Sequence, residues 1–174
     1  MPIPLEILPY DPQWAVEFQF ERDRLAKALA DVALRIDHHG STSVPGLDAK
    51  PVIDIQVSVE HLERFERYAA PLRSLGYTHV PHPDDAVCPF FHRPATWPHT
   101  HHVHVVEFGG DEEQRTLRFR DYLITHPETA AEYAALKKKL AASVDASNSA
   151  SRQAYADAKT TFISRVLGLS ARQP

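Results

Sequence analysis

Alternating and continuous apolar runs in the first two thirds of the chain predict the strands of a sheet. The clearest strand is 52–59, where valine and isoleucine dominate and Pro51 stands at the start. Shorter apolar stretches predict strands at 34–38, 77–80, 87–93 and 102–108. Gly109 and Gly110 follow the last of these and predict a turn.

Apolar residues at helical spacing predict helices on both sides of these strands. Trp14, Phe18, Leu25 and Leu29 share one face of a helix expected from 14 to about 32, with Asp11 as N-cap and Pro12 as first helical residue. A second helix is expected over 60–74, ended by Gly76. Helices at 111–125, 127 to about 144 and 148–167 follow, with fraying from Gly168 onward. The pattern predicts an α+β fold with a small mixed sheet and a helical C-terminal region.

Length and composition fit one globular domain over 1–174, with the sheet core at about 10–110 and a helical cover at about 111–168. The net charge of −4 gives no electrostatic reason to expect binding to nucleic acid. Cys88 is the only cysteine, which excludes an intrachain disulfide and a thiolate cage for zinc. The sequence offers no membrane span or signal-peptide core, so we expect a cytoplasmic protein.

A carboxylate inside the strongest strand is the first candidate for chemistry. Asp54 lies in an apolar run, where a charge is costly unless it is paired or coordinates a metal. Gly40 and Ser41 stand upstream in a turn whose backbone N–H groups and hydroxyl could bind phosphate. Ser43 and Lys50 follow in the same loop and could contribute a hydroxyl and a positive charge.

Histidines provide the second candidate, because eleven of them occur in the chain. Strand side chains alternate, so His102 and His104 share one face of their strand, and Glu107 has the opposite parity. If this strand neighbours the one that carries Asp54, the three side chains converge. Two imidazoles and a carboxylate suit Zn, Mn, Fe or Ni better than Mg. A polar cleft without metal, or plain surface histidines, are the alternatives.

Several stretches together resemble the GrpB-like family of the nucleotidyltransferase superfamily. The superfamily pattern is a Gly-Ser turn, a spacer and an acid-hydrophobic-acid triplet on a strand. Gly40-Ser41 and Asp54 match it, whereas Gln56 stands where the second acid belongs. Further family-like stretches carry the resemblance from about residue 7 to 167; they are 10–14, 101–107, 119–123, 133–140 and 155–159.

The resemblance implies a nucleotidyltransferase-like core and transfer of a nucleoside monophosphate from a nucleoside triphosphate to an unknown acceptor. It implies a divalent ion, Mg, Mn or Zn, held by Asp54, His102 and His104, with Asp54 and His104 as catalytic residues. The residues expected to bind the nucleotide and its phosphates are Gly40, Ser41, Ser43, Lys50, Arg120, Tyr155 and Lys159.

Other interpretations stay open for the same residues. Without the second acid, the cleft could bind a nucleotide with no turnover, or the histidine and carboxylate set could serve another metalloenzyme chemistry. His39 is expected to contact phosphate or to support the site. Other histidines are interpreted as loop or rim residues, and Tyr122 and Tyr133 as core; the histidines are His79, His82, His92, His99 and His101.

Overall fold

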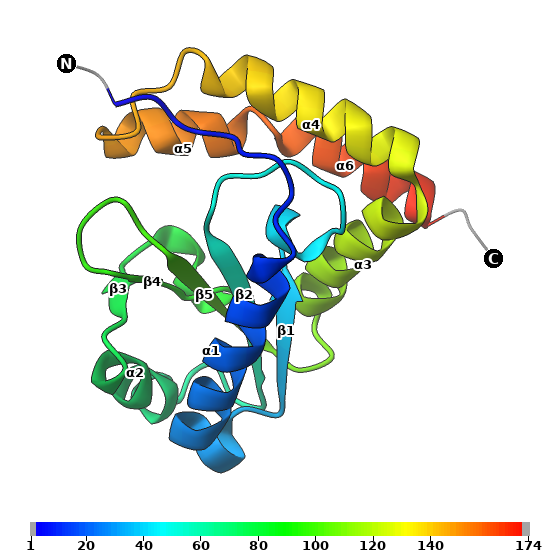
Figure 1. Cartoon of the computed structure of the whole chain (residues 1–174). Helices are drawn as coiled ribbons and strands as arrows, with labels where there is room; N and C mark the ends of the chain where they lie inside the picture. Colours follow the sequence, from blue (N-terminus) through cyan, green and yellow to red (C-terminus); the bar gives the residue numbers. More distant parts are fainter. Residues whose placement is uncertain (1–2, 172–174) are drawn as a thin grey trace.

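A five-stranded mixed sheet forms the centre of the computed structural model, which describes residues 3–171 (Figure 1). Its strands are β1 (Arg35–His39), β2 (Ile53–Val59), β3 (Thr78–Val80), β4 (Phe90–Arg93) and β5 (His101–Glu107). Their order is β1-β2-β5-β4-β3, with β2 and β5 parallel and the other neighbours antiparallel. The starts of β2 and β5 therefore lie side by side at one end of the sheet.

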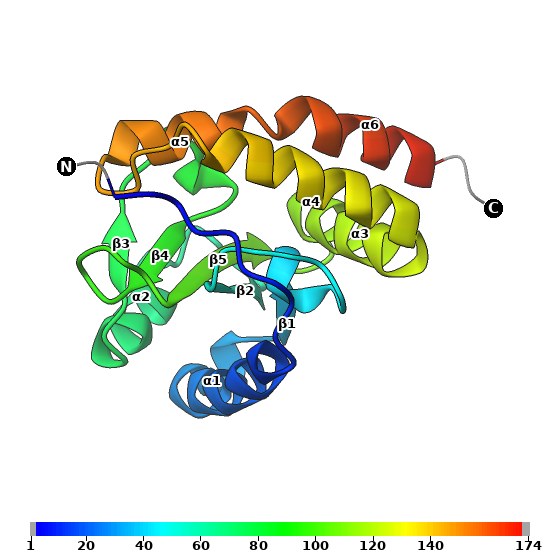
Figure 2. The same ribbon diagram turned by 45° about the horizontal axis from the view of Figure 1, so that its top comes forward.

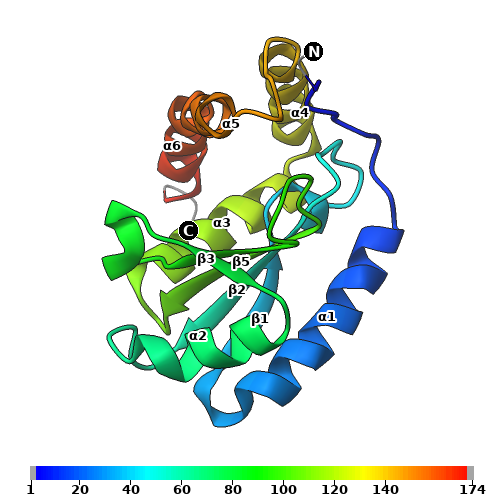
Figure 3. The ribbon, with the colours of Figure 1, turned by 90° about the vertical axis from the view of Figure 1, so that its left-hand side faces the viewer.

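Helices cover both faces of this sheet. They are α1 (Gln13–Leu29), α2 (Phe65–Ser74), α3 (Asp111–Thr125), α4 (Pro127–Ala141), α5 (Ser149–Asp157) and α6 (Thr160–Ser170). Figure 3 shows α1 and α2 on one face and α3 on the other, with α4 to α6 forming a further layer on the α3 side. Figure 2 shows α4 running alongside α5 and α6 near the end at which β2 begins.

Strand alternation divides the sheet into an apolar face and a polar face. Ile53, Ile55 and Val57 are buried with Val103 and Val105 against α1 and α2. These side chains form the main core, and their removal from water is the chief stabilising contribution. Every second residue of the same strands points to the opposite face, which is where the polar side chains lie.

Helix α3 is joined to the polar face by hydrogen bonds rather than by apolar packing alone. The hydroxyl of Ser58 donates to Oε1 of Glu113 over 2.5 Å, and the amide of Gly109 donates to Oε2 over 2.8 Å. Both Ser58 and Glu113 are buried, so these bonds satisfy polar groups that would otherwise be costly. They fix the angle at which α3 leaves β5.

The helical layer has apolar clusters of its own. One joins the loop after β1 to α3, α4 and α6 through Val44, Leu47 and Tyr133, with Phe162 stacked on Tyr133 at 5.0 Å between ring centroids. Another joins the N-terminal segment to α4 and α5 and includes Leu5, Ala141 and Tyr155. The layer therefore packs on loops of the sheet domain, separately from the main core.

The α+β fold with a mixed sheet is confirmed, but several predicted ends were wrong. The first helix begins at Gln13, with Pro12 rather than Asp11 at the N-cap position, although the Gln13 amide donates to Oδ1 of Asp11 over 2.8 Å. The α-helix ends at Leu29, because Ala30 has a φ of 47°, and a 3-10 turn, Ala30–Val32, continues to the predicted end. The helix predicted from residue 60 begins only at Phe65, after a turn in which the Arg64 amide bonds the His61 carbonyl.

Two more boundaries differ for identifiable reasons. The strand predicted from Val87 begins at Phe90, because the amides of Val87 and Cys88 bond the Asp84 carbonyl instead of a neighbouring strand. The last predicted helix is interrupted between Asp157 and Thr160. It then continues through residue 168 to Ser170, so the fraying expected from 168 is absent from the described part; residues 172–174 lie outside it. Among the described residues, no helix is both long and apolar enough to cross a membrane.

Candidate functional site

The turn after β1 packs directly onto the carboxylate of Asp54. Gly40 has φ 69° and ψ −173°, a combination that is almost confined to glycine. A Cβ at this position would lie 2.5 Å from Oδ2 of Asp54, so a side chain there would collide with the carboxylate. The following residues form a single 3-10 turn, Ser41–Ser43. The sequence prediction that the Gly-Ser turn and Asp54 belong to one site is therefore consistent with the geometry.

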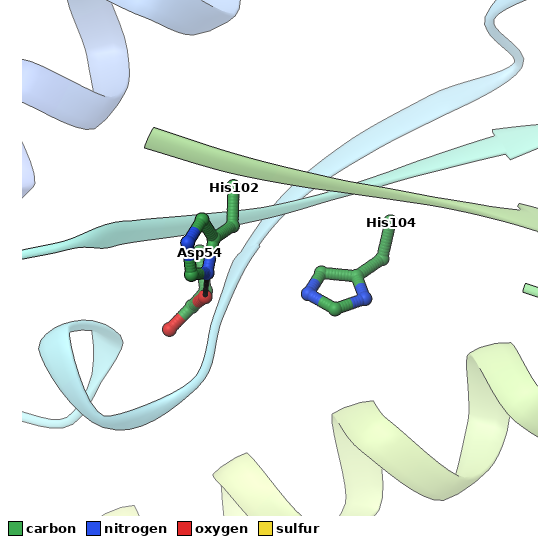
Figure 4. A group of neighbouring side chains, drawn as sticks. All are labelled: Asp54, His102 and His104. Atoms are coloured by element: carbon green, nitrogen blue, oxygen red, sulfur yellow. Dashed lines mark hydrogen bonds and ion pairs between the residues drawn. The ribbon is translucent and has the colours of Figure 1, made fainter. Parts of the chain in front are cut away.

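The two predicted histidines lie beside Asp54, as the parity argument required. Asp54 is level with His102 and Gln56 is level with His104 in the parallel β2–β5 pair. Nδ1 of His102 lies 3.1 Å from Oδ1 of Asp54 (Figure 4). One ligand atom from each of Asp54, His102 and His104 falls within 4.8 Å of the others. Glu107 is level with Val59 and therefore belongs to the opposite face.

A chain of imidazoles orients His102. Its Nε2 lies 3.1 Å from Nδ1 of His99, and His99 stacks on His92 with 3.9 Å between ring centroids. His92 in turn uses Nδ1 to donate to the carbonyl of Pro94 over 2.9 Å. His99 lies in the loop after β4, as predicted, whereas His92 lies in β4 itself, so the interpretation of His92 as a loop residue was wrong. Both histidines support the site.

His39 completes the group of imidazoles. It is level with Asp54 in the β1–β2 pair, so its side chain shares the polar face, and it is only 8% exposed. Its ring meets that of His104 edge-on at 4.9 Å between centroids. Its Nε2 is buried without a hydrogen-bond partner in the described structure. An unsatisfied buried nitrogen of this kind requires an explanation.

Gln56, which replaces the second acid, is bound to α3. It is fully buried, and its Oε1 accepts a hydrogen bond from the hydroxyl of Thr116. Its Nε2 donates to the carbonyl of Glu113 over 3.5 Å. The side chain is therefore used to fasten a helix to the sheet and offers no oxygen to an ion beside Asp54.

Burial and charge keep these groups in forms that can bind a cation. Burial alone would raise the pKa of Asp54, but the hydrogen bond from His102 and the nearby charge of Lys50 hold it well below its ordinary value. Burial lowers the pKa of His102 to about 4 and that of His39 to about 3. Asp54 is therefore ionised and the imidazoles are neutral at pH 7, which is the state in which each can coordinate a metal.

Lysines from the loop and the helical layer face this acidic group. Burial, together with the charges of Lys159 and Lys50, lowers the pKa of Lys137 to about 7, whereas Asp48 and Asp54 act in the opposite direction. Burial also lowers the pKa of Lys159 to about 8, again together with Lys50 and against Asp54. The site thus combines one carboxylate with several crowded ammonium groups, an arrangement that favours a polyanionic ligand.

Lys137 and Lys159 each stand over the ring of the tyrosine four residues earlier. Nζ of Lys159 lies 4.4 Å from the ring centroid of Tyr155, as the four-residue spacing predicted. Nζ of Lys137 lies 4.8 Å from the ring of Tyr133 and donates to the carbonyl of Asp48. In the sequence, Lys137 is the first of three consecutive lysines, a run typical of an exposed helix face with one member available to a ligand. The repeated Tyr-Lys spacing was the signal that could have singled it out.

Two predicted phosphate contacts lie elsewhere. Arg120 donates to the carbonyl of His38 over 3.0 Å and pairs with Asp121 over 2.7 Å. With Ser43, it lines a hollow at the free edge of β1, and Ser43 also donates to the carbonyl of Gly40 over 2.5 Å. The remaining predicted residues gather around Asp54; they are Gly40, Ser41, Lys50, His102, His104, Tyr155 and Lys159.

The family model described as GrpB protein matches residues 4–168, and the chain therefore belongs to the GrpB family. The glutamate-rich protein GrpB of Alkalihalophilus pseudofirmus is 31% identical over 165 residues, which are 92% of each chain. The UPF0157 protein YqkA of Bacillus subtilis is 39% identical over 138 residues, which are 79% of this chain and 40% of that protein. This chain thus spans less than half the length of that relative.

A relative with a different name contains a similar segment. The dephospho-CoA kinase of Mycolicibacterium paratuberculosis is 35% identical over 159 residues, which are 78% of this chain and 39% of that protein. The name belongs to that whole protein, of which the matching segment is the smaller part.

Solved structures share this fold. The crystal structure of the conserved protein GrpB from Enterococcus faecalis superposes with a TM-score of 0.78 and 32% identity, covering 95% of this chain and 96% of that one. A structure of the nucleotidyltransferase Cid1 with its short product ApU has a TM-score of 0.50 and 12% identity, covering 75% of this chain and 40% of that one. The second likeness concerns the fold alone.

Proposed function

We propose that this protein binds a nucleoside triphosphate with a divalent ion at Asp54 and transfers its nucleoside monophosphate to an acceptor oxygen. One observation carries the proposal: an ionised carboxylate grouped with metal-competent imidazoles faces the buried Lys137 and the half-buried Lys159 across the end of a nucleotidyltransferase-like sheet. The carboxylate side suits a cation, and the lysine side suits the phosphates that the cation would accompany.

The residues present fit a divalent ion. Asp54, His102 and His104 would hold it, since their ligand atoms lie within 4.8 Å of one another. Nδ1 of His104 lies 3.8 Å from Sγ of Cys88, which leaves Nε2 as its coordinating nitrogen. A bound ion would offset phosphate charge and lower the pKa of the acceptor hydroxyl, so that its proton is released to water.

The protein groups would mainly position the reactants, as is usual in phosphoryl transfer. The turn at Gly40 would approach a phosphate closely because no Cβ intervenes, and Lys50, Lys137 and Lys159 would neutralise the triphosphate. The acceptor oxygen forms a bond to the α-phosphorus. The bond from the α-phosphorus to the oxygen that bridges to the β-phosphate breaks, and pyrophosphate leaves with the electron pair of that bond.

Nucleotide binding without transfer is the second candidate, and Gln56 is the observation that favours it. In two-ion catalysis of phosphoryl transfer, carboxylates shared between the two ions hold them beside the attacking oxygen and the leaving oxygen. The corresponding position here is an amide that is engaged by Thr116 and Glu113. The two candidates agree on the ligand and differ in whether pyrophosphate is released.

Nucleotide binding and pyrophosphate release test the two candidates together. Metal-stripped protein is incubated with α-labelled nucleoside triphosphates and with Mg²⁺, Mn²⁺ or Zn²⁺, with dephospho-CoA among the acceptors because of the kinase relative. Thermal shift reports binding, since a ligand at a hundredfold excess over its Kd adds about 2.7 kcal/mol of stability. Binding with pyrophosphate release supports transfer, and binding alone supports the second candidate.

Asp54→Asn is the decisive variant, and Glu107→Gln is its matched control. Glu107 ends β5, is exposed and faces away from the site. Asp54→Asn should abolish metal-dependent binding and release, whereas Glu107→Gln should change neither. Equal metal-dependent nucleotide binding by the two folded variants would refute both candidate functions.

A further inference from the structure

We propose that His39 is a fourth ligand in a site built for a transition-metal dication, formed by Asp54, His39, His102 and His104, rather than for Mg²⁺. The inference names the ion of the site on which the proposed function rests. It is tested by metal binding alone, so it can stand or fall separately from nucleotidyl transfer.

The position of His39 is the first argument. Its partner across the β1–β2 pair is Asp54, and its ring lies 4.9 Å from that of His104. The ligand atoms that lie within 4.8 Å of one another are those of Asp54, His102 and His104, so His39 stands beside this group and its ring would turn towards a bound ion to join it. The side chain is more than nine-tenths buried, and its Nε2 has no partner among the described residues. An ion held by its neighbours would give this nitrogen the interaction that the protein does not supply.

The orientation of the other imidazoles is the second argument. Histidine ligands normally use one ring nitrogen for the ion and the other for a protein partner, which fixes the ring. His99 lies at Nε2 of His102, and Nδ1 bonds Oδ1 of Asp54, so an ion would take the place of the proton between Nδ1 and that carboxylate. His104 likewise has Cys88 at Nδ1. The stack of His92 on His99 extends this support to β4.

The donor set is the third argument. Three imidazoles and one carboxylate match the preference of Zn²⁺ and its first-row neighbours, whereas Mg²⁺ requires oxygen ligands in near-octahedral geometry. Gln56 and Asp37 are further strand residues on this face that carry side-chain oxygens; α3 engages Gln56, and Asp37 is paired with Arg35 and Arg120. The site therefore has one protein oxygen donor where a magnesium site normally has more.

Cobalt and zinc binding to metal-stripped protein tests the inference. Wild-type protein should bind one tight ion per chain, with Co²⁺ giving the visible absorption of a site rich in nitrogen ligands. His39→Gln should weaken Zn²⁺ binding at least about tenfold and change the Co²⁺ spectrum. A millimolar excess of Mg²⁺ should displace neither ion.

His38→Gln is the matched control for the loss of a neighbouring histidine. His38 lies on the same strand but faces α1, where it stacks on Phe18 at 4.6 Å. His38→Gln should leave the Zn²⁺ affinity and the Co²⁺ spectrum unchanged. Asp54→Asn should remove the tight site, while weaker binding to other histidines persists. Equal affinities and spectra for His39→Gln and His38→Gln would overturn the inference, as would displacement by Mg²⁺.

X-ray absorption of zinc-loaded wild-type protein removes any dependence on how the variants fold. Scattering from three imidazoles supports the inference, and scattering from two overturns it. Magnesium-dependent nucleotidyl transfer without transition-metal binding would refute this inference and leave the proposed function intact. Binding of one tight zinc ion without nucleotide binding would support this inference and refute the proposed function.

Discussion

Replacing Lys137 by methionine should make the ligand-free protein more stable at pH 7, although it removes a group that the proposed function needs. The side chain is 2% exposed, and burial lowers the pKa of its ammonium from 10.5 to about 7. Each unit of such a shift corresponds to about 1.4 kcal/mol, so holding Lys137 in this environment costs about 4 kcal/mol at pH 7. Methionine has a similar length and no charge to desolvate.

The expected gain is smaller than that cost. Lys137→Met also loses the hydrogen bond to the Asp48 carbonyl, which contributes about 1 kcal/mol. We therefore expect the free energy of unfolding to rise by about 3 kcal/mol, which corresponds to an increase of roughly 6–12 °C in Tm for a chain of this size. Urea denaturation followed by circular dichroism measures the difference directly.

The pH dependence separates this explanation from ordinary repacking. Because the pKa of Lys137 is lower in the folded protein than in the unfolded chain, the unfolded chain binds more protons between pH 7 and 10.5. The stability of the wild type should therefore rise through this window relative to that of the variant, and the advantage of Lys137→Met should fall to about zero by pH 10. Lys139→Met, at an exposed position of the same helix, should show no such trend. A variant that is less stable at pH 7, or a difference that is constant with pH, would refute the reasoning.

Three further substitutions test the residues that hold the turn, the strands and α3 in place around the site. Gly40→Ala should lower the free energy of unfolding in urea by at least about 1–3 kcal/mol and abolish metal binding. Gly46→Ala is the control, because Gly46 also has positive φ but no atom lies within 4 Å of the added Cβ. It should lower stability by a similar amount through backbone strain and leave metal binding intact. Glu21→Gln should cost about 3–5 kcal/mol in the same assay, because it leaves the guanidinium of Arg93 without its bidentate carboxylate partner. Gln56→Glu should lose about 1–3 kcal/mol and gain no magnesium-dependent activity, because the new carboxylate meets a backbone carbonyl where an amide now donates; increased turnover with Mg²⁺ would contradict this.

The convergence of Asp54, His102 and His104 could be predicted because strand parity is a local property. Alternation fixes which side chains share a face, and only the adjacency of β2 and β5 had to be assumed. The same parity argument placed Glu107 correctly on the other face. A chemical site on one face of two strands is thus accessible to sequence reasoning.

The contribution of the helices could not be predicted in the same way. Lys137 stands in a run of three lysines that reads as an exposed face, and its burial depends on where α4 packs against the loop around Asp48. The interruption before Thr160 likewise has no strong breaker, since Ala158 and Lys159 are good helix formers. His92 and His99 enter the site through the β4–β5 pairing and the loop between them, which no periodicity reveals.

The separate packing of the helical layer has a consequence for how this family can diversify. The groups that would hold the ion come from the sheet, whereas the lysines and tyrosines that would meet the ligand come largely from α4 and the α5–α6 junction. Substitutions in those helices can alter which molecule is accommodated while the ion and its histidines stay in place, because the two sets belong to different apolar clusters. The metal-binding residues and the residues that select the ligand can therefore change independently, because they lie on separate segments of the chain.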